Sequence, residues 1–206
     1  MDAPVENPAK AQRRQEILEA AFQEFSAKGY AGASMAAIAK RASASKETLY
    51  AWFENKETLY NTLFAARLDG MVSRVSAVIG ADEPSPAKVL PVVAQDIIRF
   101  MLTMAPLNLA MGAGEPNATA MRLVGQTIAE ERARFVDYLL RCRDRGEVAF
   151  DDDPFELVSL FVAMAEGEWG LRLSTGMIDK ITDQMIADHA ALATRIFLKG
   201  LAPEKT

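Results

Sequence analysis

The side chains best suited to bind another molecule lie in the first third of the chain. Ser34, Ser45 and Asn55 each stand just before an amphipathic segment, where a side-chain oxygen can accept a hydrogen bond from a first-turn N–H and so begin a helix. Lys46 and Lys56 come directly after two of these residues. Lysine ammonium groups and serine hydroxyls at helix starts can contact phosphates. The pattern therefore indicates a surface for a phosphate-bearing partner.

The pentapeptide KETLY occurs twice in this region, ten residues apart. Asn55 begins a new helix more readily than it extends an old one, so the two copies become the first turns of two helices. On the first of these helices we expect Leu49 and Phe53 on the buried side and Tyr50 on the exposed side, because residues four apart share a helix face. The two copies are thus expected to have different functions.

The elements that must position these residues are short helices. Apolar spacing predicts a helix over 8–28, a second over 35–41, a third from Ser45 to the break at Asn55, and a fourth from Lys56 to about Ile79. Two short helices joined by a tight turn, here residues 42–44, form a helix-turn-helix. This motif places its second helix in the major groove of DNA.

A longer stretch resembles a known family. Residues 13–59, RRQEILEAAFQEFSAKGYAGASMAAIAKRASASKETLYAWFENKETL, are similar to the N-terminal domain of TetR/AcrR-type transcriptional regulators. The shared pattern consists of ILEAA…F…G, S…IA and SK.TLY.WF.NKE.L. The resemblance implies a homodimeric repressor whose two N-terminal domains bind the halves of a palindromic operator in double-stranded DNA. It also implies a C-terminal domain that dimerises and often binds a small-molecule effector.

The resemblance assigns the DNA contacts residue by residue. The positions that match the family pattern, and that are expected to contact the operator, are Ser34, Ser45, Lys46, Thr48, Tyr50 and Lys56.

The chain departs from the family at the turn, where ASASKETLY stands in place of the usual AGVSKGTLY. Ser43 replaces glycine, at a cost of about 1 kcal/mol if the turn needs a positive φ there. Ala44 replaces valine, and Glu47 replaces glycine. Glu47 either accepts a hydrogen bond from a cytosine amino group, and so contributes to the sequence preference of DNA binding, or only suits the positive end of the helix.

Behind the polar stretch GADEPSP the pattern stays helical. Helices are predicted over about 87–104, 107–111, 118–145, 154–174 and 179–199, with Asp153 and Pro154 giving a strong start signal for the fourth of these. The expected fold is all-α with about nine helices. An N-terminal helix-turn-helix domain over 8–55 is followed by a C-terminal helical bundle over 56–206, and the helix from 56 to about 79 connects the two.

Methionine and aromatic stripes in the C-terminal part either form core or line an adaptable pocket, since the flexible thioether repacks around varied ligands. By analogy with the family, the candidate residues for binding a small, largely apolar effector are Phe100, Met104, Glu168 and Trp169.

The family analogy also predicts dimerisation through the last two helices. The candidate interface residues are Phe161, Val162, Ala165, Ile186, Ala190, Ala193 and Phe197. His189 lies in the last of these helices, and a structural role is expected for it.

Composition narrows the classes of function. A single cysteine and a single histidine argue against disulfides, multi-cysteine zinc sites and most catalytic triads. The chain lacks HExxH, GxSxG and phosphate-loop motifs, and a helix start accounts for the run Asp151 to Asp153. We therefore expect no enzyme, no metal and no cofactor. Without a long apolar run or a secretion signal, the chain is expected to be cytoplasmic and free of membranes.

The distribution of charge leaves one alternative open. The net charge is −5, yet residues 10–60 hold eight Lys or Arg against six Glu, a net of +2. So small a basic excess would also suit a partner-binding protein that kept the fold without binding DNA. Operator binding should weaken steeply as salt rises, which distinguishes the two.

Overall fold

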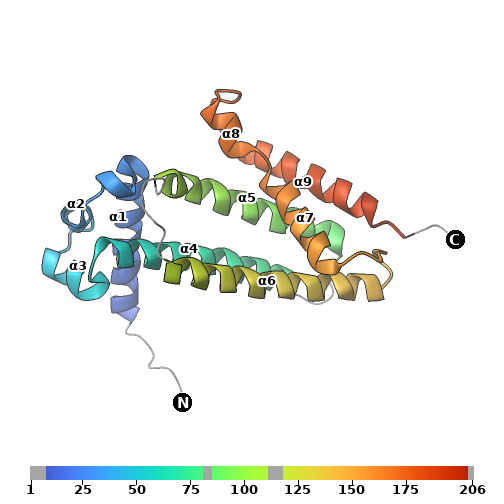
Figure 1. The fold of residues 1–206 in the computed structure, drawn as a ribbon, viewed down its shortest axis with the longest axis horizontal. Coiled ribbons are helices and arrows are strands. Elements are labelled where there is room, and N and C mark those ends of the chain that lie inside the picture. The colour runs from blue at the N-terminus through green and yellow to red at the C-terminus, as the bar shows by residue number, and fades with distance from the viewer. Residues whose placement is uncertain (1–7, 81–84, 111–117, 204–206) are drawn as a thin grey trace, which may run out of the picture. The chain divides into compact units, whose positions relative to one another are not determined.

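The computed structural model describes residues 8–80, 85–110 and 118–203. Within these ranges the chain forms nine helices and no strand (Figure 1), which confirms the all-α expectation. The chain divides into two compact units, one of Met1–Arg67 with Met104–Met121 and the other of Leu68–Thr103 with Arg122–Thr206. Each unit is described by itself.

The first unit is built from α1 (Pro8–Gly32), α2 (Met35–Arg41), α3 (Lys46–Phe53) and the first half of α4 (Lys56–Ile79). The helix end expected at Gly29 is present as a kink, because this glycine has φ 70 and ψ 168 and one further turn follows it. Apolar side chains from all four helices form the core, including the fully buried Ile17, Phe25, Ile38, Leu49, Phe53 and Leu59.

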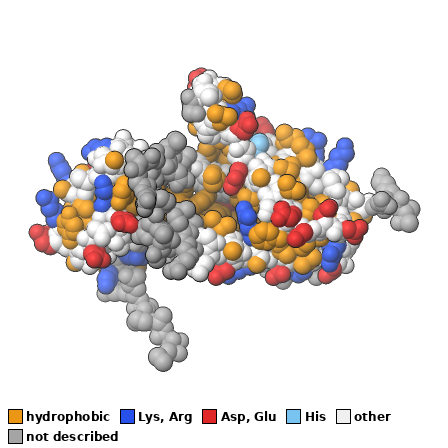
Figure 2. Space-filling model, viewed as in Figure 1, with side chains coloured by type: hydrophobic (Ala, Val, Ile, Leu, Met, Phe, Trp, Pro, Cys, Tyr) orange, Lys and Arg blue, Asp and Glu red, His pale blue; other side chains and the backbone are white. Residues whose placement is uncertain are grey.

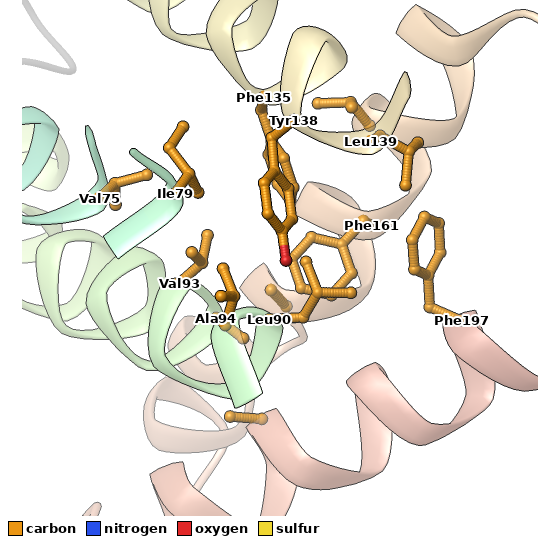
Figure 3. Close-up of a cluster of buried hydrophobic side chains, with 14 of the residues drawn as sticks. Val75, Ile79, Leu90, Val93, Ala94, Phe135, Tyr138, Leu139, Phe161 and Phe197 are labelled. Atoms are coloured by element: carbon orange, nitrogen blue, oxygen red, sulfur yellow. The ribbon is translucent and has the colours of Figure 1, made fainter. Parts of the chain in front are cut away.

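The second unit contains the other half of α4 with most of α5 (Pro86–Ala110), α6 (Ala118–Asp144), α7 (Pro154–Glu166), α8 (Trp169–Ser174) and α9 (Asp183–Gly200). Figure 3 shows its core, in which Phe135 and Tyr138 of α6 lie among aliphatic side chains of α4 and α5 and against Phe161 of α7. Phe161 meets Phe197 of α9 with ring centroids 5.0 Å apart. Burial of these large apolar side chains is the main stabilising contribution.

Helix starts with a good capping residue are confirmed. Ser34 accepts from Ala37 N at 3.2 Å, Ser45 from Thr48 N at 3.0 Å and Asn55 from Thr58 N at 2.8 Å. Asp153 caps α7 in the same way, with Pro154 at the first helical position.

Three expected boundaries in the C-terminal part are wrong. The helices expected over 87–104 and 107–111 are one helix, α5, and Met111 lies outside the described residues. The helix expected over 154–174 breaks at Gly167, which has φ 57 and separates α7 from α8. The last helix begins at Asp183 rather than near 179, because Thr182 is the cap and accepts from Met185 N at 3.2 Å.

Candidate nucleic-acid interface

The turn between α2 and α3 is a Schellman motif, the common way to end a helix. Ala44 N donates to Ala39 O at 2.9 Å and Ser43 N donates to Lys40 O at 3.2 Å, closing the last turn of α2. In this motif the residue that follows the C-cap of the helix adopts a left-handed backbone conformation. Here that residue is Ser43, which has φ 48. The turn therefore has the positive φ on which the expected cost of replacing glycine depends.

The Ser45 hydroxyl organises the first turn of α3. It accepts from Thr48 N and lies 3.0 Å from Thr48 Oγ1. The pKa of Glu47 is lowered, mainly because the Glu47 carboxylate accepts a hydrogen bond from the backbone N–H of the same residue. A hydrogen bond with the Ser45 hydroxyl lowers this pKa further. Glu47 is thus a carboxylate at any pH near neutrality. Ser34 performs the same capping function for α2.

The outer side of α3 carries the residues predicted to contact DNA. Lys46, Glu47 and Tyr50 are exposed, and half of the Tyr50 surface is open to solvent at 49%. Leu49 and Phe53 are buried on the opposite side, as their spacing predicts. Helix α3 thus presents a cation, an anion and a phenol to solvent, while its apolar side packs into the core. Figure 2 shows basic and acidic side chains interspersed on the surface of this unit.

Lys56 is engaged inside the unit. Its ammonium nitrogen donates to Tyr30 O at 2.8 Å and to Ala33 O at 3.1 Å, and it lies 4.5 Å from the centroid of the Tyr30 ring. These contacts join the first turn of α4 to the last turn of α1 and to Ala33 directly after it. The structure therefore gives Lys56 a positioning role, and the predicted phosphate contact stays a prediction.

Two further groups in this unit were missed from the sequence. Arg67 of α4 pairs with Glu19 of α1 at 2.5 Å and stacks 4.6 Å from the Phe22 ring. Glu24 of α1 is buried and accepts from Arg41 at the end of α2, at 3.1 Å. Both pairs join residues at least 17 positions apart, so no local pattern indicates them.

Comparison with known proteins agrees with this geometry. Residues 17–63 match the family described as bacterial regulatory proteins of the tetR family. The HTH-type transcriptional regulator YhgD of Bacillus subtilis strain 168 is 38% identical over 73 residues, which are 35% of this chain and 37% of that protein. The match thus spans little more than a third of the relative's length. The N-terminal part of the chain is therefore similar to the TetR family of regulatory proteins.

Two solved structures extend the likeness in fold to the whole chain. A protein from Mesorhizobium loti MAFF303099 assigned to the TetR-family transcriptional regulators has a TM-score of 0.74 at 23% identity, over 96% of this chain and 100% of its own. The flavonoid-responsive regulator FrrA has a TM-score of 0.62 at 26% identity, over 95% and 100%. Both of these proteins are assigned as regulators.

The second unit contains a cavity of about 160 Å³ between α4, α5, α6 and α7. Its walls are apolar except for Glu131, Arg132 and Glu166. Ser76 and Arg134 both donate to the Glu131 carboxylate, the latter at 2.6 Å. An apolar cavity of roughly 150 Å³ can hold one aromatic ring, whereas drug-sized ligands occupy about 300–1,000 Å³.

Only one of the four predicted pocket residues lines this cavity. Phe100 is in its wall. Met104 is fully buried and belongs to the first unit. Trp169 is buried with its ring against His189, at a centroid distance of 5.2 Å, and Glu168 is exposed at the start of α8. The sequence could not separate these residues, because helical spacing places all of them on apolar stripes.

The seven predicted interface residues lie on helices that pack against each other, but they face inward. Phe161, Ala165, Ile186, Ala190, Ala193 and Phe197 are buried within the single chain, and Val162 lines the cavity. A side chain already buried gains nothing from a second copy, so this choice of residues is corrected. The exposed apolar side chains on the same two helices are Phe155, Leu160, Leu192 and Ile196.

Three further expectations from the sequence concern His189, metal binding and membrane-spanning helices. His189 Nε2 lies 2.9 Å from Met164 O in the last turn of α7, in line with the structural role expected for it. Among the residues that the structure describes, no cluster of three His, Cys, Asp or Glu could hold a metal ion. No helix in the described ranges is both long and apolar enough to cross a membrane.

Proposed function

We propose that this chain is a ligand-responsive repressor of the TetR family that binds a palindromic operator as a homodimer. The observation that carries the proposal is the exposed Lys46, Glu47 and Tyr50 on α3, directly behind the Ser45 cap, within a stretch that matches the tetR family. In this proposal residues 8–55 bind DNA in the cytoplasm. Residues 56–206 form the domain that dimerises and binds the effector.

Each DNA-contacting residue has a distinct part in the proposal. Lys46 contacts a phosphate, Tyr50 and Thr48 complete the surface toward the groove, and Ser34 and Ser45 donate to the backbone of DNA while capping their helices. Glu47 contributes sequence preference by accepting from a cytosine amino group.

The cavity of the second unit is the proposed effector site. Phe100 and Phe135 provide aromatic surface, and Glu166 and Arg132 provide polar groups at the edge of an apolar space. Its volume favours a compact molecule of about one ring. The flavonoid response of FrrA, which is 26% identical, supports an aromatic effector.

We propose that effector binding releases DNA by changing the distance between the two recognition helices. Two half-sites on one face of DNA lie about one helical turn apart, roughly 34 Å. Helix α4 runs from the recognition domain into the second unit, with residues 56–67 in one unit and 68–79 in the other. A ligand that binds one arrangement of α4 better than the other shifts the population toward it.

Operator binding is tested by measuring the affinity of the purified full-length protein for duplexes from the DNA flanking its own gene, against a shuffled duplex. The affinity for one flanking duplex should fall as salt rises, with a slope of about −0.9 for each phosphate contact made by a Lys or Arg. Lys46→Gln removes one such contact per protomer, so the slope of the dimer should become about 2 units shallower.

The same assay addresses the other parts of the proposal. Glu47→Gln should change the ranking of single-base operator variants, and an unchanged ranking removes the proposed role of Glu47. Simple phenols and short alkylbenzenes should release the duplex; a ligand that binds without changing operator affinity would refute the allosteric role. If no flanking duplex binds better than the shuffled one, the repressor proposal fails.

A further inference from the structure

Arg13 of α1 contacts the turn between α2 and α3. Its Nη2 donates to Ala42 O and to Ser43 O, both at 2.8 Å. Its Nη1 pairs with Glu16 one helical turn along α1, at 2.6 Å. One nitrogen of the planar guanidinium thus bonds a carboxylate while the other bonds two successive carbonyls, and lysine has no second nitrogen with which to make both sets of bonds in this fixed geometry.

The turn that Arg13 contacts has a conformation that its own residues do not favour. Ser43 adopts φ 48, in the left-handed region where a Cβ crowds the backbone and where glycine is the usual residue. Both carbonyls bonded by Arg13 flank this residue: one precedes its N–H and the other is its own. The hydrogen bonds from Arg13 therefore fix the orientation of the two peptide groups on which the Ser43 conformation depends.

The turn also determines where α3 points. Ser45, the cap of α3, comes two residues after Ser43, and Lys46 and Tyr50 follow within the next five positions. A rotation of the Ser43 peptide groups would tilt the whole of α3 relative to α1. An error of about 1 Å in the placement of contact groups is enough to weaken a site appreciably.

We infer that Arg13 is a positioning residue for DNA binding: it holds the Ser43 turn in the left-handed conformation that presents α3, and so replaces the conformational preference that a glycine would supply. The inference rests on the proposed function. Arg13 acts through the turn and not through a phosphate, and the Glu16 carboxylate keeps its guanidinium in the bridging orientation.

The test combines four variants of the full-length protein with the flanking duplex that the wild type binds best. Arg13→Gln removes the charge and the bridge, and Arg13→Lys keeps the charge but loses the planar pair of nitrogens that bonds Glu16 and the two carbonyls at once. Ser43→Gly removes the need for the bridge, and the double variant combines Arg13→Gln with Ser43→Gly. Lys10→Gln is the matched control, since it removes one charge from an exposed position one turn earlier on α1.

The expected results follow from the geometry. Arg13→Gln and Arg13→Lys should each weaken binding by about tenfold, as for the loss of charge-assisted hydrogen bonds at a partly exposed site, with no change in the salt slope. In the Ser43→Gly background, Arg13→Gln should cost less than about threefold. Lys10→Gln should leave affinity within about twofold. Circular dichroism at the assay temperature ensures that every variant is folded, so that affinity is not confounded with unfolding.

Two results would overturn the inference. If Arg13→Lys binds like the wild type while Arg13→Gln makes the salt slope about 2 units shallower in the dimer, Arg13 contacts a phosphate directly. If Arg13→Gln costs the same with Gly as with Ser at position 43, the residue does not act through the turn.

A DNA-free measurement separates this inference from the proposed function. Amide hydrogen exchange of α3 in the isolated protein should be faster in Arg13→Gln than in the wild type, and Ser43→Gly should restore it. Unchanged exchange would overturn the inference even if the protein binds DNA, and faster exchange would support it even if no flanking duplex is bound.

Discussion

Glu24 is the only buried charged side chain among the residues that the structure describes, with 2% of its surface exposed. Lys28, one turn further along α1, stands 2.5 Å from one carboxylate oxygen, and Arg41 of α2 donates to the other at 3.1 Å. The hydrogen bond with Lys28 lowers the pKa of Glu24 most, burial opposes this by raising it, and Arg41 lowers it further. The ion pair between Arg41 and the ionised Glu24 carboxylate thus connects the end of α2 to α1.

This lowered pKa predicts a pH-dependent contribution to stability. Because the folded pKa is below the unfolded value of about 4.5, the contribution is fully present above that pH and is lost as the pH falls through the folded pKa. Glu24→Gln should lower the free energy of unfolding by about 1–3 kcal/mol at pH 7, as for hydrogen bonds to charged groups. Urea titrations between pH 7 and pH 3 should show the two proteins converging at the acid end.

A surface pair on the same helix is the control for this measurement. Glu16→Gln removes a partner of Arg13 from an exposed position, where an ion pair contributes about 0–1 kcal/mol. Curves for Glu24→Gln and wild type that stay parallel down to pH 3 would contradict the assignment of the pH dependence to Glu24.

At the scale of elements, helix starts could be predicted wherever the deciding group is local. Ser34, Ser45, Asn55 and Asp153 each bond an N–H two or three residues ahead, so the sequence next to them contains the information. The exposed side of α3 followed in the same way from periodicity. These two signals predicted the short helices and the outward-facing residues of α3, and the resemblance of residues 13–59 to a known family was needed to predict the helix-turn-helix.

Features that depend on distant contacts could not be predicted. Lys56 reaches carbonyls 23 and 26 residues earlier, and Arg13 reaches carbonyls 29 and 30 residues later. The break after α7 is of the same kind, since Gly167 lies between two glutamates in a stretch whose apolar spacing predicts one continuous helix over 154–174. His189 of α9 fills the space where a side chain at this position would be.

Gly167→Ala should therefore destabilise the second unit. A Cβ at this position would lie 3.0 Å from His189 Nε2 and 3.1 Å from Cε1, and φ is 57. The backbone conformation alone costs about 1 kcal/mol for alanine, and the clash with a packed side chain adds about 1–3 kcal/mol. Denaturant unfolding followed by circular dichroism measures the sum.

Gly176→Ala provides the matched comparison. Gly176 has φ 71, but a Cβ there would meet nothing within 4 Å, so this variant reports the backbone cost alone. Equal losses in the two variants would mean that His189 moves aside freely, and that its hydrogen bond to Met164 O does not hold it in place.

At the scale of the whole molecule, the proposed dimer needs an apolar surface that the single chain leaves uncovered. Helices α7 and α9 pack against each other, and their exposed sides carry Leu160 at 58% and Ile196 at 51%, with Leu192 one turn before Ile196. Apolar side chains exposed along two adjacent helices are typical of a surface that a second copy covers.

Leu160→Asp and Ile196→Asp should each convert the dimer to a monomer at micromolar concentration, measured by sedimentation, because pairing would bury an uncompensated charge. Operator affinity should fall in parallel, since one protomer binds only one half-site. Met177→Asp changes the most exposed large apolar residue beyond α8, at 68%, and should leave the dimer intact.

Phe161→Ala should instead lower the free energy of unfolding by about 3–5 kcal/mol, because its ring lies in the core of one chain. Dissociation of Phe161→Ala without loss of stability, or a wild-type chain that sediments as a monomer, would contradict this assignment of the two faces of α7.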